Sequence, residues 1–323
     1  MFRYLAVSIV LFTFISSNIF CQSPGYNVPS RKVKEEKNQE ILIPKFEFLF
    51  SFSNHTSSAF FDKDKSLITE LKDSTTFPGV QRKYTFNLMR YSFDLDFKYF
   101  ATDKLTLQAK VPFTIYNLDE TFKEHYERDK LDTTKIIKYI KESRGEFSHS
   151  RIDFIALAAD YALSNDAFIN KYFLEVRIPT GTTNGVINDP QEFWSDGAFE
   201  IIPGFLVGTS TDKFTIEAGA KYNFRGEDMT DRIIGNLNFA LHTVPGTRFY
   251  GFLEGAYNVS GGDYQKEFDI RKMPWQDEYL DIGFGFKFVI EQSYIADFSY
   301  RIRLDGQNAW NRAAYYITFG YRF

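Results

Sequence analysis

Alternation of apolar and polar residues with a period of two dominates the chain from residue 41 onward. The clearest run spans residues 104–115, where Leu, Ala, Val, Phe and Ile alternate with Lys, Thr, Gln and Pro. Residues 214–224 repeat the pattern. Successive side chains of a β-strand point to opposite faces, so each run predicts a strand with one apolar and one polar face.

These runs predict an all-β fold, a transmembrane antiparallel β-barrel of the outer-membrane type with about twelve strands, in a range of roughly ten to fourteen. A soluble β-sandwich would also alternate, but its buried row would not be matched by so many charged residues on so many long strands. Most runs exceed the roughly nine to eleven residues that a tilted strand needs to cross a bilayer. The predicted strands lie near residues 41–53, 83–99, 103–117, 149–163, 169–179, 198–208, 213–225, 231–243, 247–259, 278–290, 294–304 and 312–323.

The connections between the predicted strands alternate between short and long. The short ones are residues 100–102, 164–168, 209–212, 244–246 and 291–293. The others, most of them longer, are residues 54–82, 118–148, 180–197, 226–230, 260–277 and 305–311. Short periplasmic turns and long extracellular loops are typical of outer-membrane barrels.

The N-terminus reads as an export signal. Arg3 precedes an almost wholly apolar stretch, residues 5–15, which is too short to span a bilayer and is followed by polar residues. We therefore predict a signal peptide at residues 1–21, with a lipoprotein acylated at Cys21 as the alternative. Residues 22–40 are rich in charge and proline and predict a flexible periplasmic arm, with a plug inside the barrel as the alternative. The barrel is expected to occupy residues 41–323.

Composition narrows the class of protein further. The chain contains 36 Phe and 20 Tyr, as expected for aromatic girdles at two membrane interfaces. No apolar run of helical spanning length follows residue 21, which argues against transmembrane helices. Without Arg3, 37 basic residues stand against 42 acidic ones, so nothing indicates a nucleic-acid partner.

The last predicted strand carries an outward aromatic row that ends at the chain terminus. Tyr315, Ile317, Phe319, Tyr321 and Phe323 form this row. It resembles the terminal signal that outer-membrane proteins present to the barrel-assembly machinery, and we assign that role to Tyr321 and Phe323. The predicted partners are thus outer-membrane lipid, the assembly machinery and a small-molecule solute.

Evidence for catalysis is weak. The four histidines, His55, His125, His149 and His242, show no metal-ligand spacing, and no cofactor site is predicted. A Ser-His-Asn site like that of outer-membrane phospholipase A, itself a barrel, is the enzymatic alternative. Ser148, His149 and Ser150 begin a strand near the extracellular side, but no asparagine partner or calcium site can be assigned. We expect the protein not to be an enzyme.

Charged residues fall on the face opposite the apolar row and are candidates for lining the lumen. They are Glu175, Arg177, Glu217, Lys221, Asp281, Lys287, Asp297, Arg301 and Arg303. Opposite charges on neighbouring strands could simply pair and fill a narrow interior. Alternatively, they line a wet path and select the solutes that pass.

Two strands end in proline motifs that carry a family resemblance. One strand runs from Leu105 to Val-Pro-Phe113, and another runs from Tyr172 to Ile-Pro-Thr-Gly181. These strand-end proline motifs resemble those of the transporter-like outer-membrane barrels of the MetA pathway of phenol degradation, which are distant relatives of the FadL channels. The resemblance implies a barrel that transports small molecules.

The favoured function is a passive channel or transporter for small molecules, hydrophobic ones included. Candidate residues for solute capture in the extracellular loops are Phe193, Trp194, Trp275 and Trp310, which could equally be interfacial girdle residues. The alternative function is a plugged structural or adhesive barrel that presents its extracellular loops. The sequence does not identify the solute.

Overall fold

The computed structural model describes residues 45–61, 64–74, 80–126, 139–163, 168–180, 199–226, 231–259, 278–307 and 309–323. The predicted signal peptide and periplasmic arm lie outside these residues, and their boundaries stay predictions. Every regular element in the described part is a β-strand. No described helix is long and apolar enough to cross a membrane.

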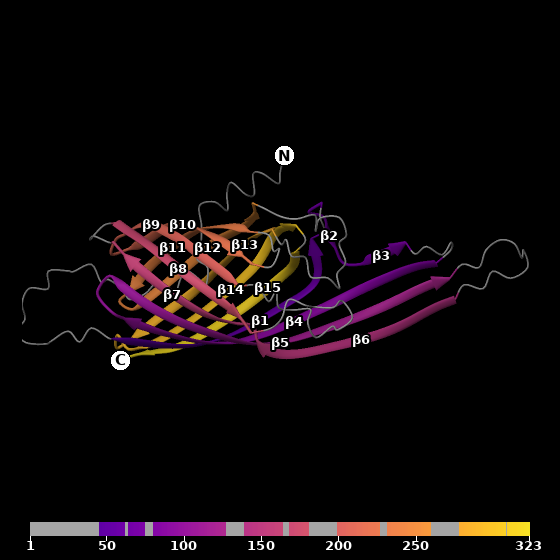
Figure 1. Ribbon diagram of the computed structural model, residues 1–323, viewed down its shortest axis with the longest axis horizontal. Helices are drawn as coiled ribbons and strands as arrows, with labels where there is room; N and C mark the ends of the chain where they lie inside the picture. The colour runs from indigo at the N-terminus through magenta and orange to yellow at the C-terminus, as the bar shows by residue number, and fades with distance from the viewer. Residues whose placement is uncertain are drawn as a thin grey trace, which may run out of the picture.

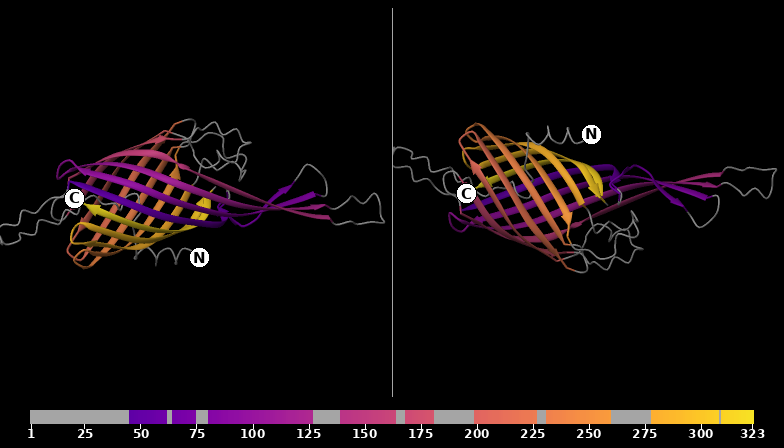
Figure 2. Two further views of the ribbon diagram at one scale, coloured as in Figure 1. Left: turned by 90° about the horizontal axis from the view of Figure 1, so that it is seen from below. Right: turned by 90° about the horizontal axis from the view of Figure 1, so that it is seen from above.

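The strands form one antiparallel barrel (Figures 1 and 2). Strands that follow one another in sequence pair around the ring. Two short strands, β2 and β3, pair with β1 and β4 but are not part of the ring. The strands are β1 (Phe46–Phe61), β2 (Leu67–Ile68), β3 (Leu71–Ser74), β4 (Val80–Phe100), β5 (Leu105–Tyr126), β6 (Tyr139–Ile152), β7 (Phe154–Ala162), β8 (Phe168–Pro179), β9 (Glu200–Ser210), β10 (Phe214–Arg225), β11 (Arg232–Val244), β12 (Thr247–Asn258), β13 (Glu278–Ile290), β14 (Tyr294–Gln307) and β15 (Ala309–Arg322).

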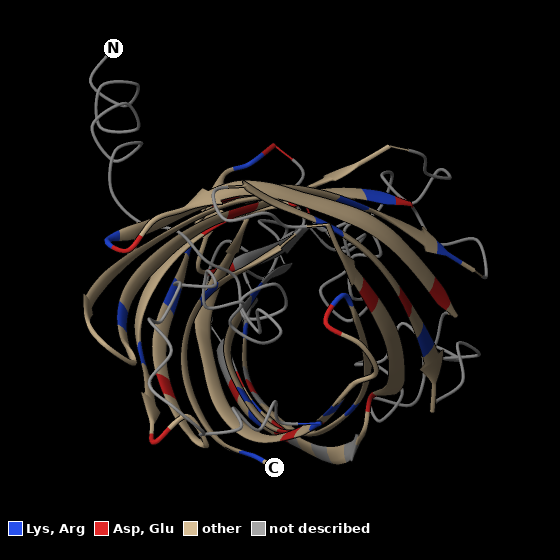
Figure 3. Ribbon diagram, turned by 90° about the vertical axis from the view of Figure 1, so that its left-hand side faces the viewer, with Lys and Arg blue, Asp and Glu red and all other residues tan. Residues whose placement is uncertain are grey.

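The ring closes because β1 pairs with both β4 and the last strand, β15. Glu47 on β1 lies opposite Lys98 on one side and Arg322 on the other. Since β6 and β7 are two parts of one wall strand, the barrel has twelve strands, as predicted. Viewed end-on, the strands form a closed ring (Figure 3). Closure pairs the first strand of the ring with the last, so the ring itself has no free edge.

The break between β6 and β7 falls at Asp153. Below it, β7 pairs with β5 and β8; above it, β6 pairs with β5 alone among the described strands. The Asp153 carboxylate accepts hydrogen bonds from Thr114 Oγ1 at 2.7 Å and from the Tyr116 hydroxyl at 3.1 Å. A buried carboxylate therefore lies at the point where β6 gives way to β7.

Three connections predicted as loops contain long stretches of strand. β5 continues to Tyr126 and β6 begins at Tyr139, so most of the predicted loop at residues 118–148 is a paired hairpin. β1 likewise runs on to Phe61, and a single residue separates β14 from β15. Beyond the bilayer no strand face needs an apolar row, so the sequence alternation fades while backbone pairing goes on. Figures 1 and 2 show β3 and the outer parts of β4, β5 and β6 projecting beyond the barrel; we call them the projecting sheet.

At the opposite end, where β1 begins and β15 ends, the turns are short. We call this the terminal end, and the other the distal end. Between β11 and β12 the turn consists of Pro245 and Gly246, and Gly246 has φ of 79°. That conformation suits the third position of a type II turn, which requires glycine or asparagine. Short turns at one end and long excursions at the other agree with the prediction.

The two faces of the wall differ as the alternation predicts. Outward side chains such as Phe48, Leu157 and Phe284 are 41%, 50% and 46% exposed. Inward neighbours are buried and polar: Glu47, Lys98 and Asp281 are at most 2% exposed. The polar residues thus occupy the interior, and the apolar belt faces outward.

Phe323 joins the outward aromatic row to the first strand. Its ring stacks on Phe46 at 5.5 Å and on Tyr321 at 6.0 Å, both distances between ring centroids. Its backbone N–H donates to the Phe46 carbonyl at 3.0 Å. A change of the Phe323 side chain leaves this backbone hydrogen bond in place. Such a change therefore tests recognition by the assembly machinery without removing the backbone pairing that closes the barrel.

We expect Phe323→Asp to lower the yield of folded protein in outer membranes, because it removes the aromatic end of the outward row. The measurement is heat-modifiable migration of the membrane fraction in gels, since a closed barrel resists detergent until boiled. Phe168→Asp, at a similarly exposed aromatic residue of another strand end, is the control. Equal yields for the two variants would contradict the role assigned to Phe323.

Candidate functional site

A cavity of about 330 Å³ lies inside the barrel and is lined from most of the wall strands. Its charged lining comprises seven basic and five acidic residues, a surplus of two positive charges in a chain whose net charge is −4. The basic residues are Arg90, Lys110, Lys171, Arg177, Lys287, Arg301 and Arg312, and the acidic ones are Asp94, Asp160, Glu175, Glu254 and Asp297. The interior is therefore electrostatically distinct from the chain as a whole.

An ion triad at the terminal end joins the first strand to both its neighbours. Glu47 accepts from Lys98 Nζ at 2.9 Å and from Arg322 Nε at 2.6 Å. Lys98 and Glu47 are almost fully buried, and Arg322 is 9% exposed. The triad crosses the seam where the barrel closes, so its ion pairs hold the first strand, β1, to both β4 and the last strand, β15.

A second network runs along the wall from β8 to β10. Arg177 donates to Glu175 at 2.5 Å and to Glu200 at 3.2 Å, and Glu200 also accepts from Arg225 at 3.1 Å. The Arg177 guanidinium lies 4.9 Å from the centre of the Phe154 ring. Arg177 thus bridges two carboxylates and stacks on an aromatic ring, which restrains its side chain at the edge of the cavity.

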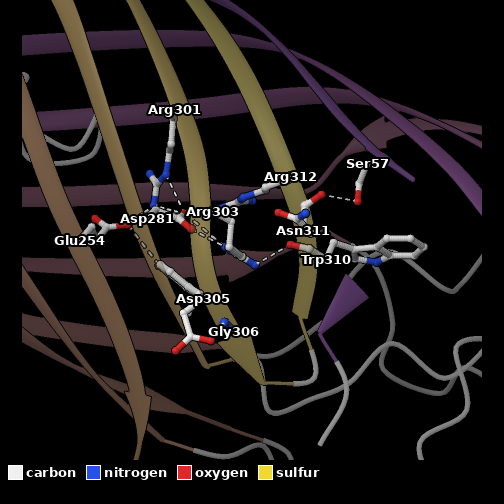
Figure 4. Close-up of polar contacts among 11 residues, drawn as sticks. Ser57, Glu254, Asp281, Arg301, Arg303, Asp305, Gly306, Trp310, Asn311 and Arg312 are labelled. Carbon is white, nitrogen blue, oxygen red and sulfur yellow. Dashed lines mark hydrogen bonds and ion pairs between the residues drawn. The ribbon is translucent and has the colours of Figure 1, made fainter. Parts of the chain in front are cut away.

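Toward the distal end, three arginines gather around one carboxylate (Figure 4). Asp281 accepts from Arg301 and Arg303, each at 2.7 Å. Its contact with Arg312 is longer, at 3.4 Å. Glu254 accepts from Arg301 at 2.5 Å. This set, which we call the Asp281 cluster, holds three positive and two negative charges.

The structure places all nine predicted lumen residues on the inward rows of their strands. Glu175, Arg177, Lys287, Asp297 and Arg301 line the cavity. Asp281 and Arg303 lie in the Asp281 cluster, Lys221 is buried, and Glu217 accepts from Asn238 at 3.3 Å. Whether they select solutes stays a prediction.

The predicted loop residues fare differently. Phe193, Trp194 and Trp275 lie outside the described residues. Trp310 is not in a loop: it lies on β15, is 9% exposed, and packs edge-on against Phe60 and Phe86. The expected loop at residues 305–311 is almost entirely strand, which turns the indole inward and away from solvent. Tyr321 and Phe323 lie on the outer face, 43% and 58% exposed.

The histidines also differ from the sequence interpretation. His55, expected in a long loop, is buried on the inner face of β1, where its Nε2 lies 3.1 Å from Ser53 Oγ. Ser148 donates to Asn117 Oδ1 at 2.7 Å on the exposed edge of β5 and β6. No group of three metal-ligating side chains occurs among the described residues.

Sequence reasoning missed several interior residues. Glu47 and Lys98 occupy polar positions between aromatic residues, a signal that was visible in the alternation. Arg90 and Asp153 lie within the predicted strands 83–99 and 149–163 but were not singled out, and Arg312 was the first residue of the predicted strand 312–323. The alternation identifies faces, but only for segments already recognised as strands.

The fold resembles solved outer-membrane proteins. The COG4313 outer membrane channel from Pseudomonas putida F1 superposes with a TM-score of 0.57 and 11% identity, over 90% of this chain and 100% of that one. The Pseudomonas putida toluene transporter TodX gives a TM-score of 0.41 and 8% identity, over 96% of this chain and 95% of that one. No protein-family profile and no curated protein sequence matches this chain.

The chain has the fold of a bacterial outer-membrane channel. The sequence resemblance to transporter-like outer-membrane barrels is thereby confirmed in fold. A closed barrel with an apolar outer belt and a charged interior satisfies its backbone internally and suits a bilayer. The described residues accordingly form a closed β-barrel of the kind that solved outer-membrane proteins have.

Proposed function

We propose that the protein is a passive outer-membrane channel for small molecules, with a preference for anions. The observation that carries this proposal is the interior cavity, whose charged lining has a surplus of two positive charges. Charged side chains in a narrow lumen replace part of the hydration shell of a passing solute and set its sign preference. Movement would follow the concentration gradient, since the proposal invokes no energy source.

The similarity in fold to a protein described as an outer membrane channel supports this proposal. Capture of solutes by Phe193, Trp194 and Trp275 remains part of the proposal, because these residues lie outside the described structure. Trp310 is not proposed for capture, since it is packed against Phe60 and Phe86.

The test is the conductance of folded protein in planar bilayers separating two potassium chloride solutions of unequal concentration. We expect discrete conductance steps and a reversal potential of the sign for chloride preference. Potassium preference would contradict the anion preference. Absence of conductance in protein that migrates as folded would contradict the channel and favour the plugged, surface-presenting barrel.

The projecting sheet supports a second candidate function, the presentation of a binding surface outside the cell. Its exposed side chains include the ion pairs Lys123–Glu142 at 3.5 Å and Lys83–Glu70 at 3.4 Å. Deletion of residues 121–144 tests whether the two functions are separate. If the sheet serves only for presentation, conductance should be unchanged in the shortened protein.

A further inference from the structure

Three side chains on adjacent strands line the cavity, and each has a buried nitrogen atom without a hydrogen-bond partner among the described residues. These atoms are Arg90 Nε on β4, His55 Nδ1 on β1 and Arg312 Nε on β15. His55 lies directly opposite Arg90 on one side and opposite Ala314 on the other. Because residues two apart on a strand share a face, Arg312 projects on the same side as Ala314, beside His55.

The carboxylates near these arginines are already shared with other donors. Asp153, which lies 3.1 Å from Arg90 Nη2, also accepts from Thr114 and Tyr116. Asp281 contacts Arg312 at 3.4 Å but is held more closely by Arg301 and Arg303. A buried donor without a partner is costly, and a charged one more so. The site therefore favours an incoming anion.

The three side chains border the cavity, and parts of both arginine side chains are accessible from it. His55, Arg90 and Arg312 all line it, and the side chains of Arg90 and Arg312 are 29% and 25% exposed. The same cavity is lined by apolar side chains, among them Leu49, Phe154, Phe173, Leu206 and Ile295. A ligand that fits both features carries an anionic head and an apolar body.

We propose that Arg90, His55 and Arg312 form a binding site for the carboxylate of a small organic acid. Two guanidinium groups supply charged donors suited to a carboxylate. In the tautomer in which Nδ1 carries the ring proton, Nε2 accepts from the Ser53 hydroxyl and Nδ1 becomes a third donor. As a step in solute passage the site rests on the proposed channel function, whereas binding itself does not.

The experiment measures binding of benzoate to the folded, detergent-solubilised full-length protein by equilibrium dialysis. Benzyl alcohol, which has the ring without the charge, and formate, which has the charge without the ring, are the comparison probes. We expect benzoate to bind more tightly than either. Arg312→Gln and His55→Leu should each raise the benzoate dissociation constant at least about tenfold, as loss of a charged or buried hydrogen bond implies.

Lys171→Gln is the matched control, because it removes one positive charge from the same cavity on β8, a strand that is not adjacent to β1, β4 or β15. It should change the dissociation constant by less than about twofold, and Arg312→Lys should bind better than Arg312→Gln. Heat-modifiable migration establishes that each variant is folded. If Lys171→Gln and Arg312→Gln weakened benzoate binding equally, the effect would come from the overall charge of the lumen, and the proposed site would be overturned.

Conductance separates this proposal from the channel. Benzoate binding that depends on Arg312 and His55 in a protein without conductance would uphold the site and contradict the channel. Conductance in a protein that binds benzoate no better than benzyl alcohol or formate would uphold the channel and overturn the carboxylate site.

Discussion

Replacing Glu47 by glutamine should lower the free energy of unfolding by about 3–5 kcal/mol, the usual cost of removing one partner from a buried ion pair. Glu47 is 2% exposed and is the acceptor for both Lys98 and Arg322. Its neutralisation would leave two cations buried at the seam between β1 and its neighbours. The expected loss is therefore large for a substitution that barely changes side-chain volume.

Urea unfolding of protein reconstituted in lipid vesicles measures the loss. Glu217→Gln is the control. Glu217 also faces inward, but it accepts from the neutral Asn238, so neutralising it leaves no cation without its partner. Replacing Glu47, Lys98 and Arg322 together by apolar residues of similar volume should recover most of the stability, since no buried charge is then left unpaired. If the single and triple variants were equally destabilised, the triad would not be acting through charge pairing.

An arginine in place of Ala218 should cost about 2–4 kcal/mol, the range for a basic residue on the lipid face near the bilayer midplane. Ala218 lies on the outer face of β10, between Val207 and Leu237 of the adjacent strands. Its neighbour Glu217 points inward, so the two positions share almost the same depth but face opposite environments.

The same vesicle assay checks this prediction, with Ala218→Leu as the control for side-chain size on an apolar surface. We expect Ala218→Leu to be close to neutral and Glu217→Gln to leave folding nearly intact. A harmless Ala218→Arg combined with a Glu217→Gln that prevents folding would invert the assigned faces.

The inward position of the charged candidates could be predicted because it depends on local alternation. Asp281, Arg301 and Arg303 are polar residues in runs whose alternate residues are apolar, and this parity holds whatever the neighbouring strand is. Their partners could not be predicted. The Asp281 cluster brings Arg312 to Asp281 from another strand, and that contact depends on the register and tilt of the whole wall.

The extent of several strands was also beyond the sequence. Residues 118–126 and 139–147 carry little apolar alternation, yet they pair across β5 and β6 from Phe113 to Tyr126. Outside the bilayer, backbone hydrogen bonds alone can maintain a hairpin, and side-chain pattern is then a poor guide. Trp310 and His55 were also misplaced, since both lie on strand segments taken for loops, although both belong to the barrel wall.

The sequence by itself determined the class of fold, the approximate strands and the face of each residue within them, because a barrel wall forces every side chain toward lipid or lumen with a period of two. Only the tertiary structure decided which charges meet. Glu47 and Arg322 are 275 residues apart and become neighbours through closure of the ring. Arg90, His55 and Arg312 likewise converge only because β4, β1 and β15 lie side by side at the seam. Ring closure and register are properties of the whole barrel, so no local pattern encodes them.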